Sequence, residues 1–129
     1  MTETKDITII GGGPTGLFAL FYAGMRGATA QIVDALPELG GQLAALYPEK
    51  YIFDVAGYPK VLAKDLVKSL AEQAAQFQQP VHLGRRVTGL EERDGLFVLH
   101  TDKGEFTSRS IVIAAGIGFS DRQRPFANP

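Results

Sequence analysis

The chain has 129 residues, a length that suits one domain or part of one. Of these residues 45% are apolar and 21% are charged, which is the composition of a globular core and not of a disordered chain. Its net charge of −1 gives no electrostatic basis for binding nucleic acid or an anionic membrane. It has no Cys, which excludes disulfides and thiolate metal sites, and its N-terminus does not resemble a signal peptide. We therefore expect a cytoplasmic protein without a nucleic-acid or membrane partner.

The apolar run at residues 7–25 is long enough to suggest a membrane span, but three glycines and a proline interrupt it from Gly11 onward. A buried strand, Asp6–Ile10, followed by a helix explains the same residues better, because strands of a parallel sheet are apolar on both faces. A second short strand, Ala30–Val33, ends at Asp34. The predicted order of strand, glycine turn, helix and strand is a βαβ unit.

The stretch at residues 40–60 departs from this pattern, since it is a long loop that is both apolar and interrupted by glycine and proline. An amphipathic helix is predicted next, Ala63–Phe77, because apolar residues recur on one face. Val81–Leu83 follows as a third parallel strand.

Residues 87–109 change in character again. An Asp-Gly pair and a Lys-Gly pair are typical of hairpin turns between three short β runs, which predicts a three-stranded meander. A continuous apolar strand, Ile111–Ala115, then returns to the parallel sheet. The predicted fold is therefore α/β, a Rossmann-like parallel sheet with a β-meander as one crossover.

The glycines after the first strand have the G-x-G-x-x-G spacing of a dinucleotide-binding turn. Gly11 makes the tight turn off the strand, Gly13 lets the backbone approach a pyrophosphate, and Gly16 permits close packing of the helix on the strand. The helix that follows directs free N–H groups and the positive end of its dipole at the phosphates.

Asp34 strengthens this interpretation, because it ends the next strand eighteen residues after Gly16. A carboxylate at this position accepts hydrogen bonds from the two ribose hydroxyls of an adenosine, and it repels a 2′-phosphate. The residues therefore predict NAD or FAD at this site and disfavour NADP.

The long loop and the meander distinguish the two cofactors, since a simple NAD domain continues after its second strand through a short connection. The sequence resembles the thioredoxin-reductase-like ferredoxin–NADP reductases in three stretches, "IIGGGPTGLFALFYAGMRG", "GGQLAALYPEKYIFDVAGYPK" and "IVIAAGIG". The letters "GGQL" also fit thioredoxin reductases, whereas "ALYPEKY" and "DVAGYPK" are more specific to the ferredoxin-reductase branch. The resemblance implies a glutathione-reductase-type FAD domain from a homodimeric flavoenzyme that moves electrons between NADPH and ferredoxin or flavodoxin.

Carried over residue by residue, the resemblance implies FAD contacts at five positions. Thr15 would lie at the pyrophosphate and Asp34 at the adenosine ribose. Gln42 and Tyr47 would meet the flavin, and the backbone of Val87 would meet the adenine. The long loop would then be apolar because it covers a flat ring system, and glycine-rich because its backbone approaches that ring closely.

Phe119 is a further implied flavin contact, at a position where the sequence departs from the family pattern. The family's Phe falls one place later, where Ser120 stands here. The implied organisation is residues 1–118 as the N-terminal part of a discontinuous FAD-binding domain, with residues 119–129 as a linker toward an NADPH-binding domain outside this segment. NADPH and the returning part of the FAD domain are both expected outside it.

Two other functions stay open. The segment could belong to a thioredoxin-reductase-type disulfide oxidoreductase, or it could be a stand-alone non-catalytic nucleotide-binding module. No catalytic residue and no metal ligand is predicted, because His82 and His100 are isolated and the cofactor would carry the chemistry. We expect the segment to be inactive as a reductase by itself.

Overall fold

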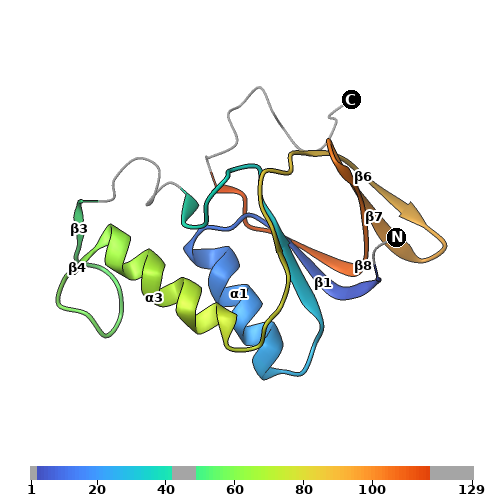
Figure 1. The fold of residues 1–129 in the computed structure, drawn as a ribbon. Coiled ribbons are helices and arrows are strands. Elements are labelled where there is room, and N and C mark those ends of the chain that lie inside the picture. The colour runs from blue at the N-terminus through green and yellow to red at the C-terminus, as the bar shows by residue number, and fades with distance from the viewer. Residues whose placement is uncertain (1–2, 42–48, 117–129) are drawn as a thin grey trace.

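The computed structural model describes residues 3–41 and 49–116 and has a Rossmann-like architecture, with helices on one side of a twisted sheet (Figure 1). The elements, in chain order, are β1 (Lys5–Ile10), α1 (Pro14–Met25), β2 (Ala30–Val33), β3 (Tyr51–Ile52), β4 (Val61–Leu62), α3 (Ala63–Ala75), β5 (Val81–His82), β6 (Val87–Arg93), β7 (Leu96–Thr101) and β8 (Gly104–Ile113).

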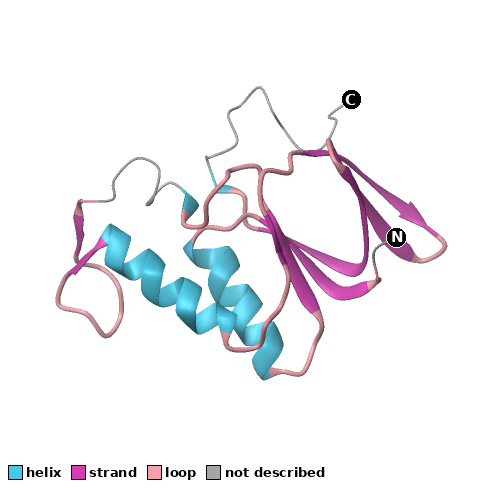
Figure 2. Cartoon of the chain, viewed as in Figure 1, coloured by secondary structure: helices cyan, strands magenta, loops and turns pink. Residues whose placement is uncertain are grey.

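The main sheet has six strands in the order β5-β2-β1-β8-β7-β6 (Figure 2). Strands β5, β2, β1 and β8 run parallel, and β8, β7 and β6 form the antiparallel meander. This arrangement confirms the predicted parallel sheet with a meander crossover. None of the helices in the described part of the chain is long and apolar enough to cross a membrane, and the apolar run at residues 7–25 is divided between β1 and α1.

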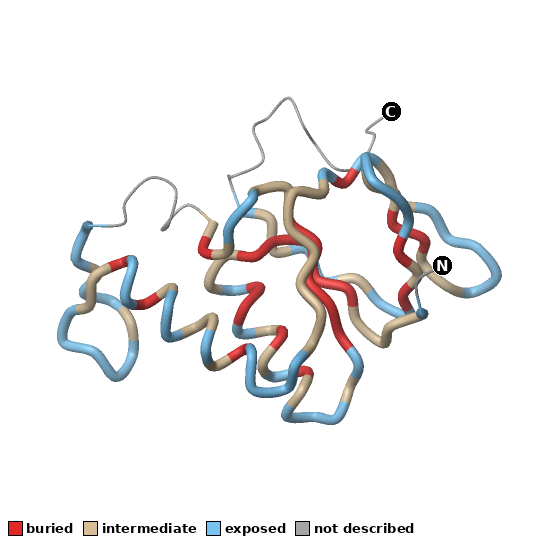
Figure 3. The backbone as a smooth tube through the Cα atoms, in the orientation of Figure 1, coloured by how far each residue is buried: buried red, intermediate tan, exposed pale blue. Residues whose placement is uncertain are grey.

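The sheet has a separate core on each face, because successive residues of a strand point to opposite sides. Ile9 packs on the helix side with residues of α1, β2 and α3, whereas its neighbour Ile10 packs on the meander side around Phe106. Figure 3 shows the buried residues concentrated in the central strands and along the inner face of each helix. Strand β2 and the second half of β1 are therefore covered on both sides, as their uninterrupted apolar sequence predicts.

The prediction of two separate strands near the end of the meander was wrong, because β8 is a single strand of ten residues. Its first half pairs with β7 as far as Ser108, and its second half pairs with β1 as far as Ile113. The polar residues between the halves stay in the strand because their hydroxyls bond to the β1 backbone. Ser108 Oγ donates to the Lys5 carbonyl at 3.2 Å, and Ser110 Oγ donates to the Asp6 carbonyl at 2.7 Å.

Two other predicted boundaries also shift. Helix α3 ends at Ala75, two residues before the predicted end, and the chain turns at Gln78 with φ of 54°. The predicted loop at 40–60 includes β3, which pairs with β4 immediately after the loop, and the Lys60 ammonium lies 4.6 Å from the centre of the Tyr51 ring. β-propensity over so few residues gives no clear sequence signal.

The second half of β8 has hydrogen-bonded partners in β1, while its register with β7 stops at Ser108. Val112 is 36% exposed and Ile113 is 59% exposed, although both belong to an apolar strand next to the centre of the sheet. Within the described residues, this segment of β8 therefore has an edge and two faces that are incompletely covered.

The packing of Phe77, just after α3, on helix α1 depends on Gly24, because a Cβ built there would lie 2.4 Å from the Phe77 ring. We expect Gly24→Ala to displace Phe77 from its contact with Phe21, where the ring centroids are 5.9 Å apart, and to destabilise the chain by about 1–3 kcal/mol. In a Phe77→Gly background both the ring and the Cβ of Phe77, which lies 2.7 Å from the new methyl group, are absent, so the same substitution should stabilise by about 1 kcal/mol through helix propensity. Urea unfolding of the four proteins measures both values; equal effects in the two backgrounds would contradict the clash.

Candidate nucleotide-binding site

Two glycines of the turn are required by the packing of the backbone. Gly11 has φ of 119°, and a Cβ there would lie 2.1 Å from the Ala114 carbonyl oxygen. A Cβ at Gly16 would lie 1.9 Å from the Gly11 carbonyl oxygen. These two positions therefore bring the end of β1, the residues after β8 and the first turn of α1 together more closely than any side chain permits.

Gly13 is different, because the nearest heavy atom of another described segment to a Cβ built there is 3.8 Å away and its φ of −80° suits any residue. It is the N-cap of α1, which has Pro14 in its first turn, and within residues 3–41 and 49–116 no side chain caps this N-terminus. The first N–H groups of a helix lack partners within the helix, and Thr15 in this turn is exposed. The space in front of Gly13 can thus admit an anionic group to free backbone donors.

Asp34 is only 7% exposed and is attached to the glycine turn. Its Oδ2 accepts a hydrogen bond from Gly12 N at 3.1 Å, and its Oδ1 accepts one from Leu36 N at 3.5 Å. Burial raises the pKa of Asp34, and the backbone hydrogen bonds from Leu36, Gly12 and Ala35 oppose that rise. Each carboxylate oxygen can accept more than one hydrogen bond, so the side chain can hold the turn and still accept ligand hydroxyls.

The start of the long loop lies directly against the glycine turn, which the sequence did not predict. Gly40 N donates to the Gly12 carbonyl at 2.7 Å, and a Cβ at Gly41 would lie 3.1 Å from Gly13 Cα. Both loop glycines have positive φ, 111° and 57°. In the sequence, the glycine pair indicates that the backbone approaches another segment closely, but it does not identify that segment.

The segment after β5 meets Asp34 from the other side. Asp34 N donates to the His82 carbonyl at 3.0 Å, Arg85 N donates to the Asp34 carbonyl at 2.9 Å, and Gly84 N donates to the Leu36 carbonyl at 3.0 Å. Val87, two residues further, is buried in the core under the meander. The structure thus brings the Val87 segment next to Asp34, with the Val87 side chain turned into the core.

A cavity of about 570 Å³ begins beside Pro14, at the N-terminus of α1, and extends along the β3–β4 hairpin to α3. Most of its lining is apolar or aromatic, and Lys50 and Asp54 supply charged groups; the other lining residues are Tyr51, Ile52, Phe53, Val55, Ala63 and Leu66. Three predicted flavin contacts, Gln42, Tyr47 and Phe119, lie outside the described residues.

These features fit a dinucleotide that carries a flat ring. A buried acid for a ribose, free helix N–H groups for phosphates and an apolar cavity follow one another along the carboxyl ends of the strands. Among the residues that the structure describes, no group of three or more His, Asp or Glu side chains could hold a metal ion. The glycine turn, Asp34 and the meander crossover define the chain as a Rossmann-like unit of the thioredoxin-reductase type.

Comparison of sequences gives the particular relationship. The chain is 57% identical over 117 residues to the ferredoxin–NADP reductase of Halalkalibacterium halodurans, and 55% identical over 123 residues to that of Thermus thermophilus. These matches cover 90% and 95% of this chain but 36% and 37% of the relatives. The predicted resemblance to the ferredoxin–NADP reductases is confirmed, and the chain spans a little over a third of the length of the curated relatives it matches. No protein-family model matches the chain.

Solved structures give the same fold. Thioredoxin reductase from Lactococcus lactis superposes with a TM-score of 0.78 at 26% identity, covering 88% of this chain and 36% of the other. Thioredoxin reductase from Gloeobacter violaceus superposes with a TM-score of 0.74 at 28% identity, covering 90% and 38%. The shared fold extends over nearly all of this chain, while the sequence is much closer to the ferredoxin–NADP reductases.

Proposed function

We propose that the chain is the FAD-binding portion of a ferredoxin–NADP reductase that moves electrons between NADPH and ferredoxin or flavodoxin. The observation that carries this proposal is the attachment of the Asp34 carboxylate to the glycine turn, beside a helix N-terminus that no side chain of the described segments caps. The names of the relatives at 55–57% identity supply the electron-transfer class.

The residues of this chain would bind and orient the cofactor. Asp34 would hold the adenosine ribose, the backbone at Val87 would meet the adenine, and Gly13 with Thr15 would receive the pyrophosphate. Bound FAD supplies two-electron chemistry toward NADPH and one-electron chemistry toward the carrier protein. The apolar cavity beside Pro14 would exclude water from the flavin ring, together with Gln42, Tyr47 and Phe119.

The rest of the enzyme belongs to the same proposal. NADPH would bind outside this segment, and the incompletely covered end of β8 is where we place the returning part of the FAD domain. A cytoplasmic homodimer is the expected assembly. A disulfide reductase is the second candidate, because solved structures of the same fold include thioredoxin reductases.

Titration of FAD with the 129-residue chain tests the binding step. We expect flavin fluorescence to change with one FAD per chain, and we expect no reduction of ferredoxin by NADPH from this chain alone. A folded chain that leaves the fluorescence unchanged would contradict the proposal. The native protein from its source then separates the two candidates, since NADPH-dependent reduction of ferredoxin favours the first and reduction of thioredoxin favours the second.

A further inference from the structure

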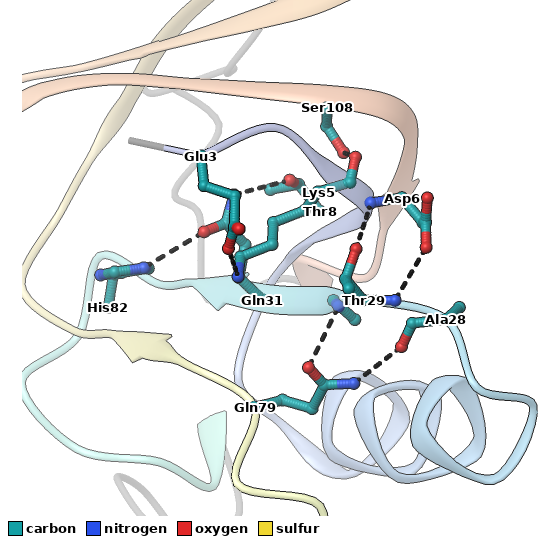
Figure 4. A network of polar contacts seen from close by, with 11 residues as sticks. Glu3, Lys5, Asp6, Thr8, Ala28, Thr29, Gln31, Gln79, His82 and Ser108 are labelled. Carbon is teal, nitrogen blue, oxygen red and sulfur yellow. Dashed lines mark hydrogen bonds and ion pairs between the residues drawn. The ribbon is translucent and has the colours of Figure 1, made fainter. Parts of the chain in front are cut away.

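A chain of polar side chains crosses three strands on the meander side of the sheet (Figure 4). Gln31 Nε2 donates to Thr8 Oγ1 at 2.9 Å, and Gln31 Oε1 lies 3.2 Å from His82 Nε2. Because the Gln31 amide nitrogen donates to Thr8, the amide oxygen is the acceptor and His82 Nε2 carries the proton. The chain therefore links β1, β2 and β5 through the Nε2–H group of one imidazole.

The surroundings hold this imidazole in one place. Thr8 is fully buried and Gln31 is 2% exposed, so the amide depends on its two hydrogen bonds. The ring of buried Phe106 packs against His82 with centroids 4.7 Å apart, and the Arg85 guanidinium lies 5.5 Å from the centre of the same Phe106 ring. A shift of the imidazole would break the bond to Gln31 and disturb the packing on Phe106.

The backbone of the same histidine is attached to the nucleotide site. The His82 carbonyl accepts the Asp34 N–H at 3.0 Å, and the Asp34 carbonyl accepts the Arg85 N–H at 2.9 Å. The backbone of Asp34 is thus hydrogen-bonded to His82, before the turn that follows β5, and to Arg85, after it. The position of the carboxylate in front of Gly12 depends on how firmly the end of β5 is held.

Protonation would disturb this arrangement, because the charged groups that face His82 are cations. They are Lys5 from β1, which also pairs with Glu3 at 2.8 Å, and Arg85 from the turn after β5. Burial, then Arg85, then Lys5 lower the pKa of His82 below its usual value of 6.5. The folded state favours the neutral ring, so this contribution to stability is present above pH 6.5 and is lost as the pH falls toward the lowered pKa.

We propose that His82 is a positioning residue for the nucleotide site, whose neutral imidazole holds the end of β5 and thereby fixes Asp34, so that the site loosens when the ring accepts a proton. This inference rests on the proposed nucleotide-binding function. It assigns a role to a residue that sequence reasoning set aside as isolated.

Calorimetric titration with ADP at about pH 8 and about pH 5.5 tests it in the 129-residue chain. His82→Gln keeps an amide donor for Gln31 and removes the titration, and His100→Gln on the exposed meander is the matched control. We expect the wild type and His100→Gln to lose about fivefold more affinity at the lower pH than His82→Gln does. Asp34 titrates in all three proteins, so the difference between them isolates His82.

Amide hydrogen exchange of the nucleotide-free proteins gives a second readout. After correction for intrinsic exchange, protection of the Asp34 N–H should fall several-fold on acidification in the wild type and in His100→Gln, but not in His82→Gln. The same loss of protection in all three proteins overturns the proposal. If the wild type binds no ADP at either pH, the proposed nucleotide function fails, and exchange still decides whether His82 controls the Asp34 bond.

The wild type alone provides a third readout, because the chain has only two histidines. Saturating ADP should lower the midpoint of the His82 titration followed by the imidazole proton resonances, as reciprocal coupling requires. This measurement keeps the test decisive if His82→Gln fails to fold. An unchanged midpoint with ADP bound overturns the proposal.

Discussion

Gly13→Ala is expected to weaken ADP and FAD binding about 100-fold or more while leaving the chain folded. Among the described residues outside its chain neighbours, a methyl group at Gly13 meets nothing closer than 3.8 Å, and the local φ is −80°, so the backbone accepts it. The same methyl group projects from the N-cap of α1, where the proposed site brings the pyrophosphate against the backbone. Thermal unfolding should be nearly unchanged, and fluorescence titration should show the loss of binding.

Gly11→Ala is the contrasting variant and is expected to destabilise the chain by more than about 3 kcal/mol. Its methyl group would lie 2.1 Å from the Ala114 carbonyl oxygen, and φ at that position is 119°. Gly27→Ala is the matched control, since Gly27 also has positive φ but has no neighbour within 4 Å, so only about 1 kcal/mol of strain is expected. If Gly13→Ala binds nucleotide like the wild type, the placement of the phosphates is wrong.

Asp34→Asn is expected to weaken ADP binding about 10- to 100-fold, because it replaces charge-assisted hydrogen bonds to the ribose with neutral ones. Glu38→Gln changes the charge equally on an exposed residue four positions away, and its affinity should match the wild type. Calorimetry with ADP compares the three proteins. Equal affinities for all three would remove Asp34 from the binding site.

In the nucleotide-free protein, Asp34→Asn is expected to change how the stability of the fold depends on pH. Burial raises the pKa of Asp34, so the folded chain binds this proton more tightly than the unfolded chain does. The contribution of Asp34 to stability is therefore largest when it is protonated and falls as the pH rises from the usual Asp range through the raised pKa. Asp34→Asn should lack this fall, which urea unfolding at several pH values can measure, and a steeper fall in the variant would contradict the buried-carboxylate explanation.

The sequence predicted the features whose signals are local. The glycines after β1, Asp34 at the end of β2 and the turn pairs of the meander each have a recognisable spacing, and the structure places all of them in the expected elements. The continuity of β8 has no such signal. Ser108 and Ser110 interrupt its apolar pattern, and the atoms that keep them in the strand are backbone carbonyls more than 100 residues away in the sequence.

The same reason explains what was missed at the site. Gly40 and Gly41 pack on the glycine turn across 28 residues of chain, and His82 meets Gln31 across 51. A single histidine in a β run is most often an ordinary core or surface residue, so composition gives no reason to select it. Its proposed role combines a side-chain bond to Gln31 with a backbone bond to Asp34, and both partners are distant from His82 in the sequence.

Strand β1 also has a consequence for synthesis of the chain. It lies between β2 and β8, and residues 5–10 pair with residues 108–113. A ribosome adding roughly 5–20 residues per second needs roughly 5–20 s to make the intervening chain. During that time one edge of the central strand has no partner from its own sheet, and non-local pairing of this kind is slow to form. The nascent protein therefore presents an apolar strand edge to the cell before β8 exists, and this is the interval in which chaperones would be needed.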